Sequence, residues 1–154
     1  MTEISAVQAA QPVIPTLGRI WASLDGLAQP IVRLAVGGLM VPHGLTRILS
    51  GGIQPTADFM AKNGLQPAYA LALYITSLEV IGGILLVIGL FTRPIALLVI
   101  GFMATAVMVH LQAFGYFWTA KGCEVPLFWG VMAFTVLIKG GGRYSIDHLL
   151  GREI

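Results

Sequence analysis

Four long apolar segments constrain this chain more than any other feature of its sequence. They cover residues 30–49, 68–90, 93–113 and 124–139. An α-helix needs about 20 mostly apolar residues to cross the hydrocarbon core of a bilayer. Only 10% of the residues are charged, against about 25% in an average soluble domain. We therefore predict an all-α integral membrane four-helix bundle, whose short last helix spans the bilayer when Glu124 and Lys139 snorkel to its two surfaces.

Two stretches outside these segments have amphipathic patterns. Near the N-terminus, apolar residues follow the spacing of one helix face: Leu17, Ile20, Trp21, Leu24 and Leu27. This pattern predicts an interfacial helix that lies on the membrane. In the first loop, Thr56 as N-cap and Gly64 as stop signal predict a short surface helix. The predicted organisation is a tail with an interfacial helix over residues 1–28, followed by a four-helix domain over residues 29–154.

The distribution of basic residues predicts the orientation of the chain. The side of the membrane that holds both termini carries Arg19, Arg93, Lys139, Arg143 and Arg152, and the other carries Arg47, Lys62 and Lys121. Loops rich in lysine and arginine stay in the cytoplasm, so both termini are predicted to be cytoplasmic. The formal charge of +2 is spread along the chain without the basic cluster that nucleic-acid binding needs. The expected partners are the lipid bilayer and other membrane proteins.

Two charged residues lie inside the predicted spans. Glu79 is near the middle of the second span, and Arg33 is near the start of the first. A charge at this depth costs about 3 kcal/mol on insertion scales, so it normally faces a partner, a cavity or a functional site. We predict a buried ion pair between Arg33 and Glu79, because arginine has a longer reach than His43, the other potential partner. The pattern leaves open whether this pair is structural or functional.

A second group of polar residues falls toward one face of the membrane. His43, His110 and Glu124 lie near the same ends of their spans, and we predict that they line a ligand pocket together with Glu79. Such a pocket suits a quinone head group, a metal or proton transfer. We assign no metal, since the two histidines lack the i, i+4 spacing of paired ligands. His43 and Glu79 are the candidate catalytic residues.

Three segments of the chain resemble, in order, recurring segments of the DoxX family of small four-span bacterial membrane proteins. They read "RLAVGGLMVPHGLTR", "SLEVIGGILLVIGLFTRPIA" and "GGGRYSID", and the resemblance covers about residues 30–148. The matching positions are Arg33, Gly37, His43, Gly44, Glu79, Gly82, Gly83, Gly89, Thr92, Arg93, Glu124, Gly142, Tyr144, Ser145 and Asp147. Arg47 stands where the family often has lysine.

The resemblance implies a four-helix bundle in the bacterial cytoplasmic (inner) membrane. Members of the family are linked to thiosulfate:quinone oxidoreductase, to membrane-associated oxidoreductase complexes and to cysteine modification of copper-related peptides. We therefore expect a subunit of a redox-associated, quinone-linked membrane complex. It would hold no covalent cofactor, since the chain has no dinucleotide fingerprint, phosphate loop or cysteine cluster. The alternative is a non-catalytic accessory subunit that packs against a larger respiratory or photosynthetic assembly. Whether this chain is itself an enzyme stays open, because fold transfers within a family better than activity.

Overall fold

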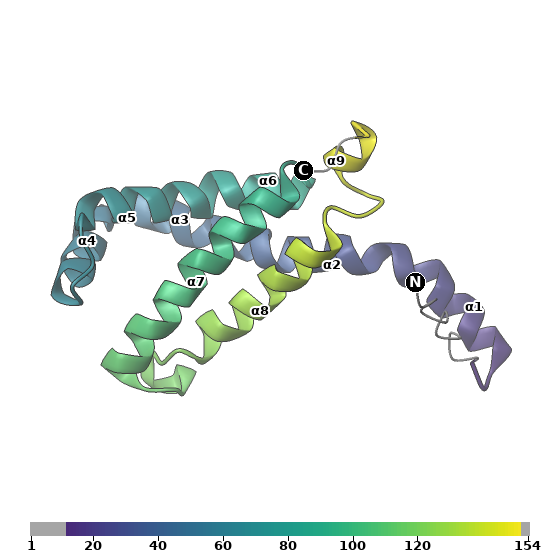
Figure 1. Ribbon diagram of the computed structural model, residues 1–154, viewed down its shortest axis with the longest axis horizontal. Helices are drawn as coiled ribbons and strands as arrows, with labels where there is room; N and C mark the ends of the chain where they lie inside the picture. Colours follow the sequence, from purple (N-terminus) through teal and green to yellow (C-terminus); the bar gives the residue numbers. More distant parts are fainter. Residues whose placement is uncertain (1–11, 152–154) are drawn as a thin grey trace, which may run out of the picture.

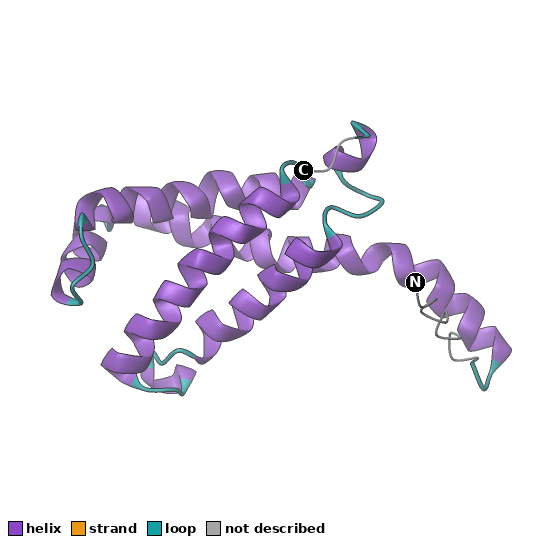
Figure 2. Ribbon diagram, in the orientation of Figure 1, coloured by secondary structure: helices purple, strands orange, loops and turns teal. Residues whose placement is uncertain are grey.

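The computed structural model describes residues 12–151, and all its regular elements are helices (Figure 2). The predicted all-α class is therefore confirmed. The first eleven residues of the predicted tail, and Arg152 of the charge count, lie outside the described part of the chain.

The first long helix runs without interruption over 35 residues, Pro15–Leu49. Its successive parts are α1 (Pro15–Leu24), the 3₁₀ turn η1 (Asp25–Leu27), α2 (Ala28–Arg33), the π-turn η2 (Leu34–Gly38) and α3 (Leu39–Leu49). A helix, α1, is thus present where the interfacial helix is predicted, and it continues directly into the first apolar segment. It projects away from the other helices (Figure 1) and buries none of its residues. Its contact with the membrane surface stays a prediction.

The predicted short helix of the first loop is α4 (Ile53–Lys62). It begins three residues before the expected N-cap, so Thr56 lies inside its first turn. There the Thr56 hydroxyl donates a hydrogen bond of 2.8 Å to the carbonyl of Gly52. α4 packs on the next helix through a small buried cluster: Ala57, Met60, Ala72 and Ile75.

The second long helix covers 21 residues, Ala68–Ile88, and returns alongside the first. It consists of α5 (Ala68–Ser77), the π-turn η3 (Leu78–Gly82) and α6 (Gly83–Ile88). The two helices cross at a pair of glycines: a Cβ atom on Gly37 would lie 2.5 Å from the carbonyl oxygen of Gly83. This backbone contact fixes the antiparallel register of the pair. Each helix contains one π-turn, a rare feature that often marks a functional site.

The remaining two helices form a second antiparallel pair. α7 (Thr92–Phe114) has 23 residues, and α8 (Glu124–Lys139) has the 16 residues predicted for it. The short turn η4 (Trp118–Ala120) lies between them. Three helices of the described chain are long and apolar enough to cross a membrane: Pro15–Leu49, Ala68–Ile88 and Thr92–Phe114. α8 is about 24 Å long, shorter than the hydrocarbon core of about 30 Å, so the arrangement of four crossings stays a prediction.

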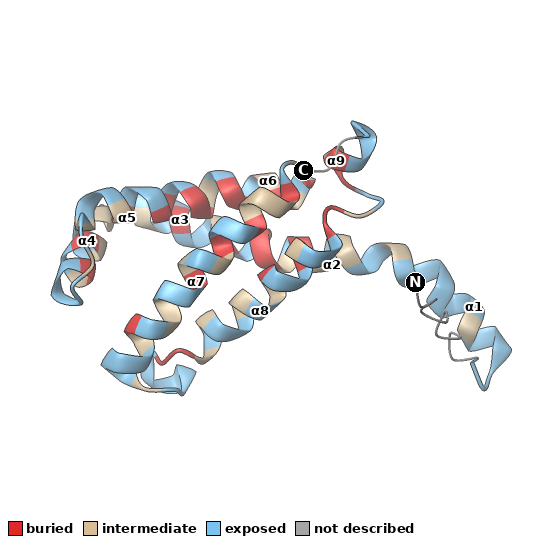
Figure 3. Cartoon of the chain, in the orientation of Figure 1, coloured by how far each residue is buried: buried red, intermediate tan, exposed pale blue. Residues whose placement is uncertain are grey.

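The two helix pairs cross at an angle, and the hydrophobic core lies at the crossing (Figure 1). Its buried residues come from all four helices: Val36, Met40, Leu78, Leu86, Ala96, Val99, Met103, Ala133 and Val136. Outside this core, α7 and α8 have many exposed residues (Figure 3), including large apolar side chains such as Leu97 and Phe134. Apolar exteriors of this extent mark contact with a membrane or another protein.

Two polar clusters and a candidate ligand cavity

Arg33 lies in a polar cluster at the short connection between the second long helix and α7. Only 1% of the residue is exposed. Its Nη1 donates hydrogen bonds to the carbonyls of Leu86 (3.1 Å) and Val87 (3.2 Å), and its Nη2 donates to the carbonyl of Tyr144. The guanidinium therefore ties the first two helices to the C-terminal segment, and it does so entirely through backbone oxygens.

Asp147 holds the same segment from the other side. It lies in the short helix α9 (Ile146–Leu149), and its carboxylate accepts hydrogen bonds of 2.9 Å from the backbone N–H groups of Phe91 and Thr92. These N–H groups are at the N-terminus of α7, where a negative charge is favourable. The N–H of Asp147 in turn donates to the carbonyl of Gly89 at 2.9 Å. We call Arg33, Gly89, Ser145 and Asp147 the C-terminal clasp.

Gly89 occupies the centre of the C-terminal clasp. Its φ is +71°, and a Cβ atom there would lie 2.1 Å from Nη1 of Arg33 and 2.5 Å from Cβ of Ser145. Only glycine combines this left-handed conformation with so close an approach. The resemblance at "GGGRYSID" thus coincides with residues that fasten the C-terminal segment to the first two long helices and to α7.

The predicted ion pair between Arg33 and Glu79 is not present; the partner of Glu79 is Arg47. The reason lies in the helix register and in the direction of helical side chains. Side chains point back toward the N-terminus of their helix, so Arg47 reaches back to the level of Gly44, where a Cβ would lie 3.0 Å from Cβ of Glu79. Arg33 points the same way along this helix, and from its position that direction leads away from Glu79, to the carbonyls of Leu86 and Val87 in α6.

The carboxylate of Glu79 is buried, and both of its oxygens accept hydrogen bonds. The residue lies on the π-turn η3 and is 5% exposed. Nη1 of Arg47 donates to Oε2, and Nη2 donates to Oε1 at 3.3 Å, so the pair is bidentate. Nη1 also donates to the hydroxyl of Thr76 at 3.4 Å. Bidentate charge-assisted bonds of this kind are among the strongest in proteins and fix the orientation of both groups.

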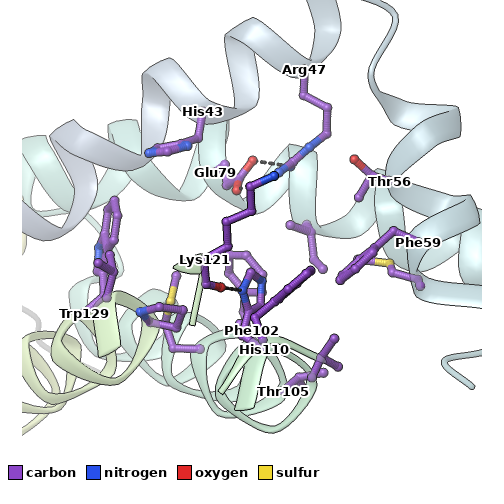
Figure 4. Close-up of a pocket in the computed structure, with 18 of the residues that line it drawn as sticks. His43, Arg47, Thr56, Phe59, Glu79, Phe102, Thr105, His110, Lys121 and Trp129 are labelled. Carbon is purple, nitrogen blue, oxygen red and sulfur yellow. Dashed lines mark hydrogen bonds and ion pairs between the residues drawn. The ribbon is translucent and has the colours of Figure 1, made fainter. Parts of the chain in front are cut away.

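This ion pair lies on the wall of a large cavity between the two helix pairs, which we call the Glu79 cavity. Its volume is about 680 Å³, within the range of pockets for small molecules. Figure 4 shows His43 and Arg47 on one wall and His110 and Lys121 on the other. The remaining surface is mainly apolar and aromatic, with Met40, Phe59, Phe102, Met103 and Trp129.

The two histidines face the same cavity from different helices. The ring of His43 makes an edge contact with Trp129, with 5.8 Å between ring centroids. Nδ1 of His110 lies 2.7 Å from the carbonyl oxygen of Lys121. Because a carbonyl only accepts, Nδ1 carries the hydrogen. The ammonium of Lys121, which extends into the cavity (Figure 4), has no partner among the described residues.

Glu124 does not line the Glu79 cavity. Its carboxylate accepts a hydrogen bond of 3.0 Å from the backbone N–H of Trp118, and it lines a separate surface pocket with Tyr116 and Trp118. Because Glu124 begins α8, its side chain points back over the connection that precedes the helix. The structure thus brings His43, Glu79 and His110 to one cavity and places Glu124 outside it.

The sequence reasoning missed Arg47 and Lys121 as residues of the cavity. For Arg47 a signal was available, since His43 and Arg47 are four residues apart and share one face of α3. Lys121 gave no such signal, because it is in a connection whose path depends on its left-handed backbone, with φ +65°. Across residues 12–151, no group of three or more His, Cys, Asp and Glu side chains is placed to hold a metal.

The fold and these two clusters define a class of protein: a small helical membrane protein with a clasped C-terminus and an internal cavity beside a buried ion pair. The DoxX family model matches residues 28–112. This chain belongs to the DoxX family.

Two known bacterial proteins are similar to this chain in sequence. Inner membrane protein YphA of Escherichia coli K12 is 32% identical over 136 residues, covering 79% of this chain and 92% of that protein. An uncharacterized protein of Haemophilus influenzae is 28% identical over 120 residues, covering 76% of this chain and 86% of that protein. No solved structure shows significant similarity. The chain is therefore a DoxX-family membrane protein, similar to one named as an inner membrane protein.

Proposed function

We propose that this protein is an integral membrane subunit of a redox-associated complex and that the Glu79 cavity binds a quinone. One observation carries the proposal: a cavity of about 680 Å³ with an apolar lining ends at a buried arginine–carboxylate pair. Ligand pockets typically combine such a lining with a few convergent polar groups.

The residues of the cavity suit a quinone ring. The two carbonyl oxygens of a quinone only accept hydrogen bonds, and the cavity offers N–H donors on His43 and Arg47. Both carboxylate oxygens of Glu79 already accept hydrogen bonds from Arg47. The Glu79 carboxylate therefore orients the guanidinium of Arg47, which is the donor. A bound quinone would supply a two-electron, two-proton redox couple. Phe59 and Trp129 provide aromatic faces against which a flat ring can pack.

The proposal includes four crossings, with α8 as the fourth, and cytoplasmic termini. α8 forms a hairpin with α7, which supports a crossing in the opposite direction. Its two ends carry Glu124 and Lys139, whose head groups would reach the two membrane surfaces. Arg33 and Glu79 are both sheltered from lipid, at 1% and 5% exposure.

A second candidate function, an accessory subunit of a larger membrane assembly, is supported by the exterior of α7. In the most apolar window of that helix, only 17% of the residues are buried inside the protein. A photo-crosslinking amino acid at Leu97, which is 57% exposed, would test this role in native membranes. Crosslinks to one defined protein favour the accessory role, and crosslinks to lipid alone argue against it.

The quinone proposal is tested by purification in mild detergent followed by solvent extraction and chromatography of quinones. We expect the purified protein to retain quinone. The Glu79→Gln variant should retain about tenfold less, as expected for a loss of about 1.4 kcal/mol. Gln54→Ala is a matched control, because Gln54 is exposed on α4 and bonds only to Asp58. A quinone-free preparation of the parent protein, which also fails to take up added quinone, would refute the proposal.

A further inference from the structure

A second, smaller pocket adjoins the Glu79 cavity. Its volume is about 400 Å³, and it is lined by residues of α3 and of the start of the first loop: Pro42, His43, Thr46, Arg47, Ser50, Gly52 and Thr56. We call it the polar pocket. Three of these residues, His43, Arg47 and Thr56, also line the Glu79 cavity. The two spaces are therefore neighbours that share these three side chains as a common wall.

The polar pocket differs in chemistry from its surroundings. Pro42, Thr46 and Ser50 follow at intervals of four and so form one stripe along α3. The hydroxyls of Thr46 and Ser50 have no hydrogen-bond partner within residues 12–151. The neighbouring face of the same helix carries exposed apolar side chains, among them Leu45 (43% exposed) and Leu49 (84%). Hydroxyls without a protein partner are favourable in water and costly in hydrocarbon.

The ion pair connects the two spaces asymmetrically. Glu79 lines only the Glu79 cavity, while the side chain of Arg47 lines both and is 20% exposed, against 6% for the Glu79 side chain. A molecule in the polar pocket therefore meets Arg47 and His43 before it can reach the carboxylate. The other charged or titratable groups that face the cavity, His110 and Lys121, belong to the far wall.

We infer that the polar pocket is an aqueous entrance, through which water and protons reach the Arg47–Glu79 pair from one side of the membrane. His43, which belongs to both spaces, is the residue past which this water reaches the polar end of the Glu79 cavity. The use of these protons by a bound quinone rests on the function proposed above. The entrance itself rests only on the two adjoining pockets and the polar stripe of α3.

The test is the accessibility of single cysteines in sealed membrane vesicles. The native Cys123, which is 3% exposed, is first replaced by alanine. Thr46→Cys reports on the polar pocket and His43→Cys on its inner end, and Leu45→Cys on the outer face of the same helix is the matched control. The probe is a membrane-impermeant cationic methanethiosulfonate, which reacts with the hydrated thiolate. We expect both pocket variants to react at least about tenfold faster than the control, because an apolar environment suppresses the thiolate.

A blocking variant sharpens this test. Ser50→Trp fills the polar pocket and should slow the labelling of His43→Cys about tenfold, since the thiol loses contact with water. Leu49→Trp adds the same side chain to the adjacent exposed position and should leave the labelling rate unchanged. Equal rates for the Thr46→Cys and Leu45→Cys variants, or labelling of His43→Cys that Ser50→Trp does not slow, would overturn the inference.

The quinone proposal and the entrance fail separately in these experiments. A protein that retains quinone but shows no preferential labelling refutes the entrance alone. Preferential labelling in a protein without quinone supports the entrance and refutes the proposed ligand.

Discussion

The C-terminal clasp and the Glu79 cavity each hold an arginine and a carboxylate within the helices, but they use them differently. In the clasp, Arg33 and Asp147 bond to backbone groups at helix ends. Beside the cavity, Arg47 and Glu79 bond to each other and face an open space. A buried charge in a membrane protein is thus no sufficient sign of a functional site. The partner of the charge and the space beside it distinguish a fastening from a site.

The largest expected effect is on the clasp. Arg33→Ala removes the donor from the partly buried carbonyls of Val87 and Tyr144, at about 1–3 kcal/mol each, whereas the carbonyl of Leu86 still accepts from the N–H of Gly89. We therefore expect a loss of roughly 2–6 kcal/mol of stability. The measurement is thermal unfolding in detergent, followed by size-exclusion chromatography. Arg47→Ala is the counterpart at the cavity and should cost less, because water can enter beside Glu79. Equal losses would break the distinction between the two clusters.

A second prediction isolates the close packing at Gly89. Gly89→Ala should cost about 2–5 kcal/mol, from a left-handed backbone at about 1–2 kcal/mol and from overpacking at about 1–3 kcal/mol. Gly64→Ala is the control: Gly64 ends α4 with the same pattern of backbone hydrogen bonds and a φ of +77°, but no atom lies within 4 Å of an added Cβ. The difference between the two melting temperatures measures the contact with Arg33. If both variants melt together, Gly89 serves the turn and not the clasp.

These two clusters also show how far the sequence alone leads. Hydropathy located the helices well, and the bounds of α8 are those predicted, because a helix that faces lipid must be apolar along its length. The high cost of exposing a charge to hydrocarbon predicted that Arg33 and Glu79 are sheltered by neighbouring helices, and both are buried. Their partners were missed, because counting depth from the helix ends ignores both the register fixed at Gly37 and the direction of the side chains. Counting depth placed His43 and His110 toward the same face of the membrane. That they line one cavity also depends on the angle between the helix pairs, which no local sequence pattern contains.

A third prediction compares lysine at the two arginine positions. Arg33→Lys should cost about 2 kcal/mol, since one ammonium cannot reproduce a planar fork that serves carbonyls in two directions. Arg47→Lys should cost less than about 1 kcal/mol, because the Glu79 carboxylate can pair with a point charge next to a roomy cavity. Quinone content should persist in Arg47→Lys; its complete loss would show that the fork of Arg47 holds the ligand directly.

The smallest expected effect concerns the wall that α4 contributes to the cavity. Phe59 stacks on Phe114 of α7, with ring centroids 6.3 Å apart and planes 6° from parallel, and so joins the two helix pairs on the far side of the cavity from the clasp. Aromatic pairs contribute about 0.5–1.5 kcal/mol beyond their buried area. Phe59→Leu keeps most of the apolar surface but loses the stacking, so we expect only this small loss of stability. Release of bound quinone should nevertheless become faster, by roughly tenfold at most for an energy of this size, because both rings line the cavity. Stopped-flow measurement of quinone release checks this. A variant with unchanged release but a large drop in melting temperature would instead make α4 part of the structural framework, like the clasp.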